Sequence, residues 1–517
     1  MSGSRATLRA ALPAAVALLP ALFLLGLLDT PLYEDGLFWW VPRALLLAQD
    51  GPAWIAAGDL PLACLPNAAL PPQWTGGLPD YGHPPLWFHY LAAWVRILGP
   101  HAWVIHLACV PVALALGAGT VTLARRLAGP AGAVLAAAAL LSPPLLAQLL
   151  RPDTDLPLLA ASLWALVALI DRRPLHFALL SILAAWLKEP AALLVLPALV
   201  LGARERCPRL LAACTAAPLA LVAWGLIHHQ QVGWALAGAE HLPTGVGPYL
   251  RDLGAVLYLS LVSGGRWVTW LLLAAALVVS RQVGHRVGRA APSPADPSPA
   301  TRALLVCGVF ATSQLLVFAG LNFLGGRGAQ DAYTHVRYLL PAITTTTLLG
   351  LALALRHALA SMPGLRSHPQ RVALIMAAVV VAAALPTSRW LHPRGPEANL
   401  FGIDQARAWQ RSVDLIEQHR PATGRVWVES HLYTALTRPY AGLVDRPMTG
   451  VVPFGPSTRP EEPEPGDLVV HSRYGEPLSR LAELVLEPRA SATSGSAWVK
   501  LETVGVGRSA TAPSPSK

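Results

Sequence analysis

Repeated apolar segments of membrane-spanning length are the strongest constraint on how this chain can fold. They lie near residues 10–28, 102–124, 131–150, 156–170, 174–188, 190–203, 209–228, 265–280, 303–321, 338–355 and 372–387. A helix needs about 20 apolar residues to cross the hydrocarbon core of a bilayer. Several segments are shorter, so their boundaries are approximate. The pattern predicts an α-helical polytopic membrane protein with about 11 transmembrane helices.

The charge distribution agrees with this prediction. Only 13% of the 517 residues are charged, whereas soluble domains carry roughly 25%. With a cytoplasmic N-terminus, the threading places about twice as many basic residues inside as outside, as the positive-inside rule requires. The net charge of +10 is therefore explained by the loops and does not indicate a nucleic-acid partner. The predominance of arginine over lysine, with abundant Ala, Pro and Gly, suggests a GC-rich bacterial genome. We expect the protein in the bacterial cytoplasmic (inner) membrane.

The threading predicts two domains. Residues 1–387 form a transmembrane domain with a long first outer loop, 29–101, and a Pro- and Ser-rich cytoplasmic linker, 281–302. Residues 388–517 lie outside the cytoplasm. Their amphipathic "IDQARAWQRSVDLIEQHR" predicts a helix, and "GRVWVES", "GDLVVHS" and "AWVKLETV" predict short strands. These elements predict a small extracytoplasmic α/β domain with a disordered C-terminal tail.

The expected outer loops carry the ionisable groups that matter most. Glu34 and Asp35 follow the first span, and residues 81–99 predict an interfacial helix rich in aromatic side chains. Ionisable groups near the membrane core are costly and usually functional. Similar candidates occupy the second and the last outer loop, namely Asp153, Asp155, His335, Arg337 and Tyr338.

The order of several motifs resembles a known family. After the acidic pair come "HPPLWFHYLAAWVRILG", "LARRLAG", "DTDLPLLAASLWALVAL", "LAAWLKEPAALLVLPALVL" and "RYLLPAI". This order resembles bacterial GT-C glycosyltransferases of the protein-mannosyltransferase and lipid A aminoarabinose-transferase type, over roughly residues 8–350. The resemblance implies a multi-pass enzyme that uses a polyprenyl-phosphate-linked sugar at the outer face of the membrane.

The resemblance also implies roles for individual residues. Asp35 best matches the acid that acts at the acceptor, although Glu34-Asp35-Gly36 departs from the commoner Asp-Glu order and leaves Glu34 open for that role. The second outer-loop acid corresponds to Asp155 or, less closely, to Asp153. Arg337 is expected to contact the lipid phosphate. The other residues expected at the donor site are His335, Tyr338, Lys188 and His83.

These residue types suit glycosyl transfer. A base must take a proton from the acceptor hydroxyl or amine, and nearby carboxylates are compatible with an oxocarbenium-like transition state. The departing phosphate requires a cation, for which arginine offers two parallel hydrogen bonds.

Each candidate also has a structural interpretation. Asp35 and Glu34 could be solvated loop acids, Asp155 could cap the helix that follows it, and Arg337 could anchor a span at the interface. For Asp153, a capping or surface role is favoured over a role in the site. The remaining alternatives are a turn pair of Lys188 with Glu189 and ordinary loop histidines at His83 and His335.

Two other functions and one cofactor stay open. An O-antigen ligase or polymerase would show an arginine-rich large outer loop, and a transporter would usually show related halves or polar groups within several spans. The acceptor could be a glycan, a lipid or a protein. Asp35, Asp155 and His335 offer ligands for a divalent cation, but members of this broad fold differ in metal use, so no metal is predicted.

Overall fold

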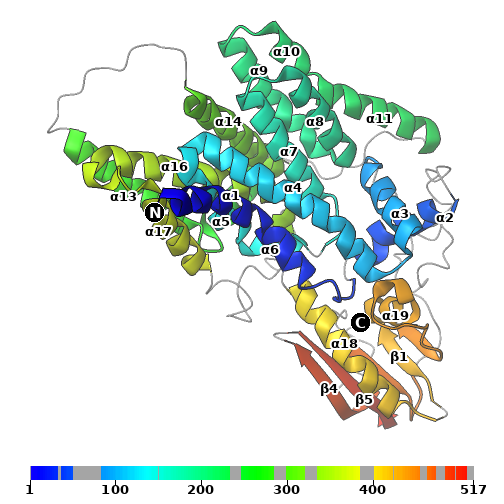
Figure 1. Ribbon diagram of the computed structural model, residues 1–517. Helices are drawn as coiled ribbons and strands as arrows, with labels where there is room; N and C mark the ends of the chain where they lie inside the picture. The colour runs from blue at the N-terminus through cyan, green and yellow to red at the C-terminus, as the bar shows by residue number, and fades with distance from the viewer. Residues whose placement is uncertain are drawn as a thin grey trace. The chain divides into compact units, whose positions relative to one another are not determined.

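The computed structural model (Figure 1) divides into two compact units. The first unit comprises Met1–Gly26, Tyr81–Trp87 and Cys109–Leu400, and the second comprises Leu27–Asp80, Phe88–Ala108 and Phe401–Lys517. The structure describes residues 2–32, 36–50, 83–149, 151–232, 246–284, 298–320, 335–384, 401–422, 424–454, 463–472, 484–494 and 497–508.

The first unit is built from helices. They are α1 (Ser2–Leu25), most of α4 (Ala102–Ala128), α5 (Gly132–Leu140), α6 (Pro143–Leu149), α7 (Asp155–Ile170), α8 (Pro174–Leu187), α9 (Val195–Arg204), α10 (Pro208–Ala213), α11 (Ala216–Val232), α12 (Val246–Leu257), α13 (Trp267–Gly284), α14 (Pro299–Gly320), α16 (Leu340–Ser361) and α17 (Pro369–Ala384). Short irregular helices connect some of them, including η6 (Glu189–Leu194), η8 (Tyr258–Val262) and η9 (His335–Leu339).

Every apolar segment marked in the sequence is mainly helical over its described residues, which confirms the predicted fold class. Four of the described helices are long and apolar enough to cross a membrane, and a fifth span results if the bent pair Tyr249–Val262 and Trp267–Gln282 is one span. Shorter apolar helices include Ala11–Leu25, α7, α8 and α17. The chain is thus a multi-pass helical protein, and the count of about 11 spans stays a prediction.

Helix α16 shows how polar side chains are accommodated in an apolar element. Thr344 to Thr347 are all buried. The Thr345 hydroxyl donates to the Pro341 carbonyl at 2.6 Å, and the Thr346 hydroxyl donates to the Ala342 carbonyl at 2.7 Å. These bonds to the preceding turn satisfy hydroxyls that would otherwise be buried without a partner. The helix can therefore pack tightly on its neighbours, and α13 and α14 both contact it.

The second unit contains a five-stranded sheet. Its strands are β1 (Val426–Glu429), β2 (Val451–Phe454), β3 (Leu468–Ser472), β4 (Leu484–Ser494) and β5 (Ala497–Arg508), in the order β2-β1-β3-β5-β4. Strand β1 is parallel to β2 and β3, whereas β5 is antiparallel to β3 and β4. Helix α18 (Phe401–His419) packs on β4 and β5, and α19 (Ser430–Thr437) contacts β1 and β2. The predicted helix and three predicted strands are confirmed as α18, β1, β3 and β5.

Parts of the first outer loop belong to the same unit as this sheet. They include η1 (Gly36–Trp40), α2 (Val41–Asp50) and most of α3 (Leu86–Leu98). The Leu32 N–H donates to the Ala441 carbonyl at 2.8 Å, and the Tyr440 hydroxyl donates to the Leu37 carbonyl at 3.2 Å. Both sides of the acidic pair are thus bonded to the region after α19. The predicted boundary between residues 387 and 388 lies outside the described residues and stays a prediction, as do the interfacial location of α3, the linker 281–302 and the disordered tail.

The bend between η8 and α13 predicts a glycine requirement. Gly265 has φ +77°, and a Cβ there would lie 2.5 Å from the backbone of Ala383. We expect Gly265→Ala to lower the free energy of unfolding by about 2 kcal/mol or more, because the left-handed backbone and the clash both penalise a side chain. Thermal unfolding in detergent, followed by tryptophan fluorescence, measures the loss.

Gly308→Ala in α14 is the matched control. A Cβ at Gly308 meets nothing within 4 Å, and alanine is the better helix former by about 1 kcal/mol. An unchanged or higher melting temperature is expected for this variant. Equal melting temperatures for the two variants would contradict the packing described at Gly265.

Candidate functional site

The loop before α7 is buried and holds two carboxylates. Asp153 is 1% exposed and Asp155, the first residue of α7, is 3% exposed. The Asp153 carboxylate accepts a hydrogen bond from the Asp155 N–H at 3.3 Å, so it satisfies one free donor of the helix start. The Trp87 indole donates to the Pro152 carbonyl at 2.6 Å and fastens the loop. The local sequence therefore brings both acids to one end of α7.

Lys188 reaches Asp155 from the end of α8. Lys188 has an extended backbone, with φ −166° and ψ 149°, and separates the end of α8 from the start of η6. Its Nζ donates to Asp155 Oδ1 at 2.5 Å, and both side chains are at most 5% exposed. This buried ion pair joins residues 33 positions apart. Lys188 therefore pairs with Asp155, and the alternative turn pair with Glu189 is not formed.

Arg337 adds a second cation from η9. Its Nη1 lies 3.4 Å from Asp153 Oδ2, and its Nε lies 3.7 Å from Asp155 Oδ2. Its Nη2 donates to the Tyr338 hydroxyl at 3.0 Å. Lys188 Nζ and Arg337 Cζ lie 4.3 and 4.9 Å from the centre of the Tyr338 ring, so that ring contacts both cations. At 15% exposure, the Arg337 side chain is the most accessible charged group of these four.

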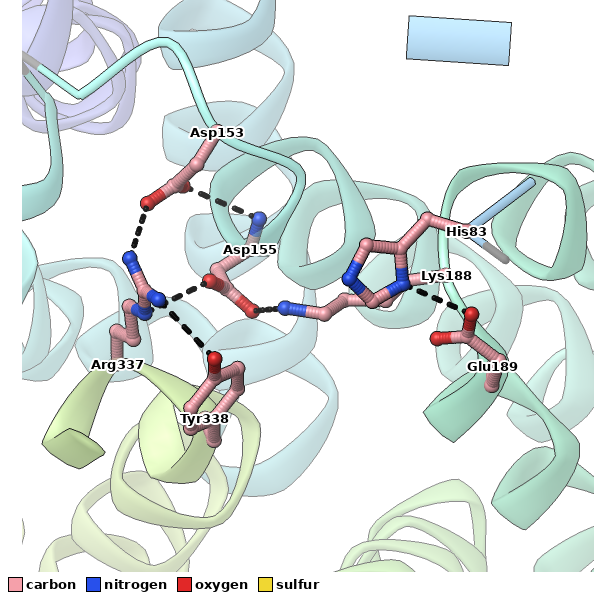
Figure 2. Close-up of polar contacts among 7 residues, drawn as sticks. All are labelled: His83, Asp153, Asp155, Lys188, Glu189, Arg337 and Tyr338. Carbon is pink, nitrogen blue, oxygen red and sulfur yellow. Dashed lines mark hydrogen bonds and ion pairs between the residues drawn. The ribbon is translucent and has the colours of Figure 1, made fainter. Parts of the chain in front are cut away.

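A second pair flanks this cluster. His83 Nδ1 lies 2.9 Å from Glu189 Oε1, and the two side chains are 27% and 29% exposed. Figure 2 shows the seven residues together: Lys188 lies between the carboxylate of Asp155 and the His83–Glu189 pair, and Arg337 lies between the two aspartates and Tyr338.

The charges of the cluster are nearly balanced, with a small excess of positive charge near neutral pH. Three cations, Arg151, Lys188 and Arg337, act on the Asp153 carboxylate together with the negative charge of Asp155. Burial, followed by the charge of Asp155, raises the pKa of Asp153 to about 7 although Arg337 opposes the shift. Burial therefore favours the protonated form of Asp153 relative to an aspartate in water. A cluster of this kind can accept an anion.

The structure brings together five of the residues that the sequence singled out for the site. They are Asp155, Lys188, Arg337, Tyr338 and His83. Glu34 and Asp35 lie outside the described residues, and only the backbone of His335, in η9, is described. The roles predicted for these three residues stay predictions.

Two participants were not expected from the sequence. Asp153 was assigned a capping or surface role, and the structure gives it both the cap and the contact with Arg337. The only sequence signal for Asp153 was its position two residues from another acid, Asp155, at the start of an apolar segment. Glu189 contacts His83 across 106 residues, and no local pattern indicates such a pairing.

A metal site is a separate matter. Among the described residues, no group of three or more His, Cys, Asp and Glu side chains is placed to hold a metal ion. The divalent site considered from the sequence uses Asp35 and His335, whose side chains are outside the described part of the chain.

The raised pKa of Asp153 predicts that the stability of the folded protein depends on pH. Because the folded-state pKa of Asp153 is about 7 and an unfolded aspartate titrates near 3.9, folding favours the protonated form. The contribution of Asp153 to the free energy of unfolding is full below about pH 4 and is lost as the pH rises through 7. We expect Asp153→Asn to gain melting temperature relative to the wild type between pH 5 and pH 8. A relative loss over that range would mean that the ion pair with Arg337 outweighs burial.

Asp155→Asn is the contrasting variant. It leaves Lys188 buried without its 2.5 Å partner, which typically costs about 3–5 kcal/mol. We expect this variant to be destabilised at every pH in the same measurement.

Comparison with known proteins agrees with this architecture. ArnT from Cupriavidus metallidurans bound to undecaprenyl phosphate matches with a TM-score of 0.53 and 15% identity, covering 98% of this chain and 99% of that chain. ArnT from the same organism in the apo state matches with a TM-score of 0.52 and 15% identity, covering 96% and 98%. No family model matches the sequence, and the comparison with curated proteins finds no match. The likeness extends over nearly the whole chain, and this multi-pass protein therefore has the same fold as these ArnT structures.

Proposed function

We propose that this protein is an inverting glycosyltransferase. It moves a sugar from a polyprenyl-phosphate-linked donor to an acceptor at the outer face of the bacterial cytoplasmic membrane. The observation that carries the proposal is the buried cluster of Asp153, Asp155, Lys188 and Arg337, in a chain whose fold matches an ArnT structure bound to undecaprenyl phosphate.

Arg337 is proposed to bind the donor phosphate. Its contacts with Asp153 and Asp155, at 3.4 and 3.7 Å, are longer than the 2.7–2.9 Å of a fully formed charge-assisted hydrogen bond. A phosphate can therefore replace them at modest cost and receive two parallel hydrogen bonds from the guanidinium. Lys188 supplies further positive charge when the bond from the sugar to the phosphate breaks.

Asp155 is proposed to act as a positioning residue. A carboxylate bonded to an ammonium group at 2.5 Å is a poor proton acceptor, because its charge is already neutralised. Its contribution is to hold Lys188 and Arg337 in place. The base that removes the acceptor proton is then Asp35 or Glu34. As that proton leaves, the acceptor atom bonds to the anomeric carbon while the carbon–oxygen bond to the phosphate breaks, which inverts the configuration.

Arg337 variants test the phosphate role. Loss of a charged hydrogen bond costs about 1.5–3 kcal/mol, so Arg337→Ala should raise the donor concentration needed for half-maximal rate about tenfold or more. Arg337→Lys keeps the charge but not the planar fork, and an intermediate effect is expected. The measurement is the initial rate of sugar release from polyprenyl-phosphate-linked donors.

Arg251→Ala is the control for nonspecific loss of an arginine. The side chain of Arg251 is 62% exposed and lies 3.4 Å from Asp252. Its donor dependence should match the wild type. A wild-type donor dependence for Arg337→Ala would assign Arg337 to anchoring alone.

The acidic pair provides the second test. Asp35→Asn preserves shape and removes the proton acceptor, which typically costs about 10²- to 10⁴-fold in rate. Glu34→Gln is the paired variant, and donor binding should persist in both, measured as donor-induced protection against heat. A larger loss in Glu34→Gln would transfer the role of base to Glu34. Near-normal turnover by the double variant would remove this loop from the chemistry.

A further inference from the structure

Two helix ends in the first unit share an unusual backbone motif. Helix α7 is followed by Asp171-Arg172-Arg173 before Pro174 begins α8, and α9 is followed by Glu205-Arg206-Cys207 before Pro208 begins α10. Arg172 has φ +57° and Arg206 has φ +50°, and they are the non-glycine residues with positive φ in the described part of the chain. In both turns a backbone N–H reaches back across the helix end, from Arg173 to the Ala168 carbonyl and from Cys207 to the Gly202 carbonyl, each at 2.9 Å. Both are Schellman turns.

An arginine in this position is costly. The left-handed conformation is normally taken by glycine, because a Cβ adds roughly 1–2 kcal/mol there. Helix α4 follows the usual pattern, since Gly129 at its end has φ +64°. Each arginine side chain must therefore make an interaction that offsets the cost of the left-handed backbone.

For Arg172, ion pairing gives part of the reason. Its guanidinium holds both oxygens of Glu205, at 2.7 and 2.9 Å. Arg126 holds both oxygens of Asp171 in the same way, at 2.7 and 2.8 Å. Arg302 lies 3.8 Å from Glu205. These pairs join the ends of α4, α7 and α9 to the start of α14. They also provide both Asp171 and Glu205 with a cationic partner.

Arg206 has no such explanation. Its side chain is exposed and forms no hydrogen bond or ion pair with another described residue, although its backbone N–H donates to the Ala203 carbonyl at 3.2 Å. Other arginines lie in these turns and at the ends of α4 and α14 that pair with them; Arg125, Arg172, Arg173, Arg204 and Arg209 are exposed, whereas Arg126 is half-buried and Arg302 is 13% exposed. We call this group the basic turn surface: Arg125, Arg126, Arg172, Arg173, Arg204, Arg206, Arg209 and Arg302, with Asp171 and Glu205 as its acids. Eight positive and two negative charges leave a net charge of +6.

The location of this surface points to the membrane. Asp155 begins the 16-residue helix α7 and Asp171 directly follows it, so the surface lies about 24 Å from the acidic cluster along the helix axis. That length is close to the thickness of a hydrocarbon core. Large apolar side chains beside the arginines are exposed, including Leu175 at 67% and Leu179 at 58% on α8, and Leu211 at 36% on α10. Arginines bordering an exposed apolar face match the boundary between acyl chains and headgroups.

We propose that the basic turn surface binds the phosphate groups of anionic membrane lipids, with Arg173, Arg206 and Arg209 as the residues that hold them. Guanidinium groups suit phosphate oxygens through two parallel hydrogen bonds. The start of α8 adds N–H groups that have no partner within the helix, beside the Arg173 side chain. The strained backbone at Arg206 is then explained by the ligand that its side chain binds.

The test uses the purified full-length chain in neutral detergent. Affinity for phosphatidylglycerol and for phosphatidylcholine is measured from the rise in melting temperature with lipid concentration. Each arginine at a membrane surface contributes roughly fivefold in affinity. We therefore expect Arg173→Gln/Arg206→Gly/Arg209→Gln to lose about 100-fold in affinity for phosphatidylglycerol and to retain its weak response to phosphatidylcholine.

Arg206→Gly alone separates binding from folding. Glycine is the favoured residue at φ +50°, so the melting temperature without lipid should be unchanged or higher, while affinity for phosphatidylglycerol falls about fivefold. A lower melting temperature without lipid would show that the arginine is structural and would overturn the proposal.

Arg281→Gln/Arg356→Gln/Arg371→Gln is the matched control. It removes three exposed arginines from α13, α16 and α17, outside the basic turn surface. Its affinity for phosphatidylglycerol should stay near that of the wild type. An equal loss in the two triple variants would mean a general effect of charge. Equal stabilisation by inorganic phosphate would mean a site for free anions, and either result would overturn the lipid proposal.

Discussion

The buried ion pair between Lys188 and Asp155 is the interaction on which the candidate site depends. Each of these ions costs several kcal/mol to remove from water, and a close partner is what makes burial tolerable. At 2.5 Å and at most 5% exposure, neither group can be moved without leaving the other unpaired. The start of α7 and the end of α8 are therefore held together. Arg337 joins them from a segment 184 residues beyond Asp153, so the cluster exists only when these elements are packed.

Helix α7 carries charge of opposite sign at its two ends. Asp153 and Asp155 lie at its N-terminus, whereas Arg172 and Arg173 follow its C-terminus. Both placements are favoured by the helix dipole, whose positive end lies at the N-terminus. An almost entirely buried apolar segment separates them. The same helix can therefore present an anion-binding cluster at one surface and a lipid-binding turn at the other, with both kept out of the hydrocarbon core.

The carboxylates of the cluster differ in what they can do. Asp155 is neutralised by Lys188, whereas burial raises the pKa of Asp153 and favours its protonated form. The ion pair with Lys188 makes Asp155 a poor proton acceptor, and Asp153 is 1% exposed and contacts Arg337, so we propose that both act on the cations and not on the acceptor. Together they position two cations, which is what the departure of a phosphate requires. This division of roles is the reason for assigning the base to the first outer loop, whose flanking residues Leu32 and Leu37 are bonded to Ala441 and Tyr440.

The sequence by itself determined the elements whose bonding is local. Apolar helices satisfy their own backbone groups, so most of them were recognised, although the apolar stretch Tyr249–Val262 was not. The central strands β1, β3 and β5 were apolar enough to identify. The edge strands β2 and β4 were missed, because each contains a proline that weakens its pattern. Only the tertiary structure decided that Lys188 pairs with Asp155, that Asp153 contacts Arg337 and that His83 meets Glu189. These contacts join residues 33, 184 and 106 positions apart. Their partners are chosen by helix packing and by the high cost of an unpaired buried charge, neither of which is written in a local pattern.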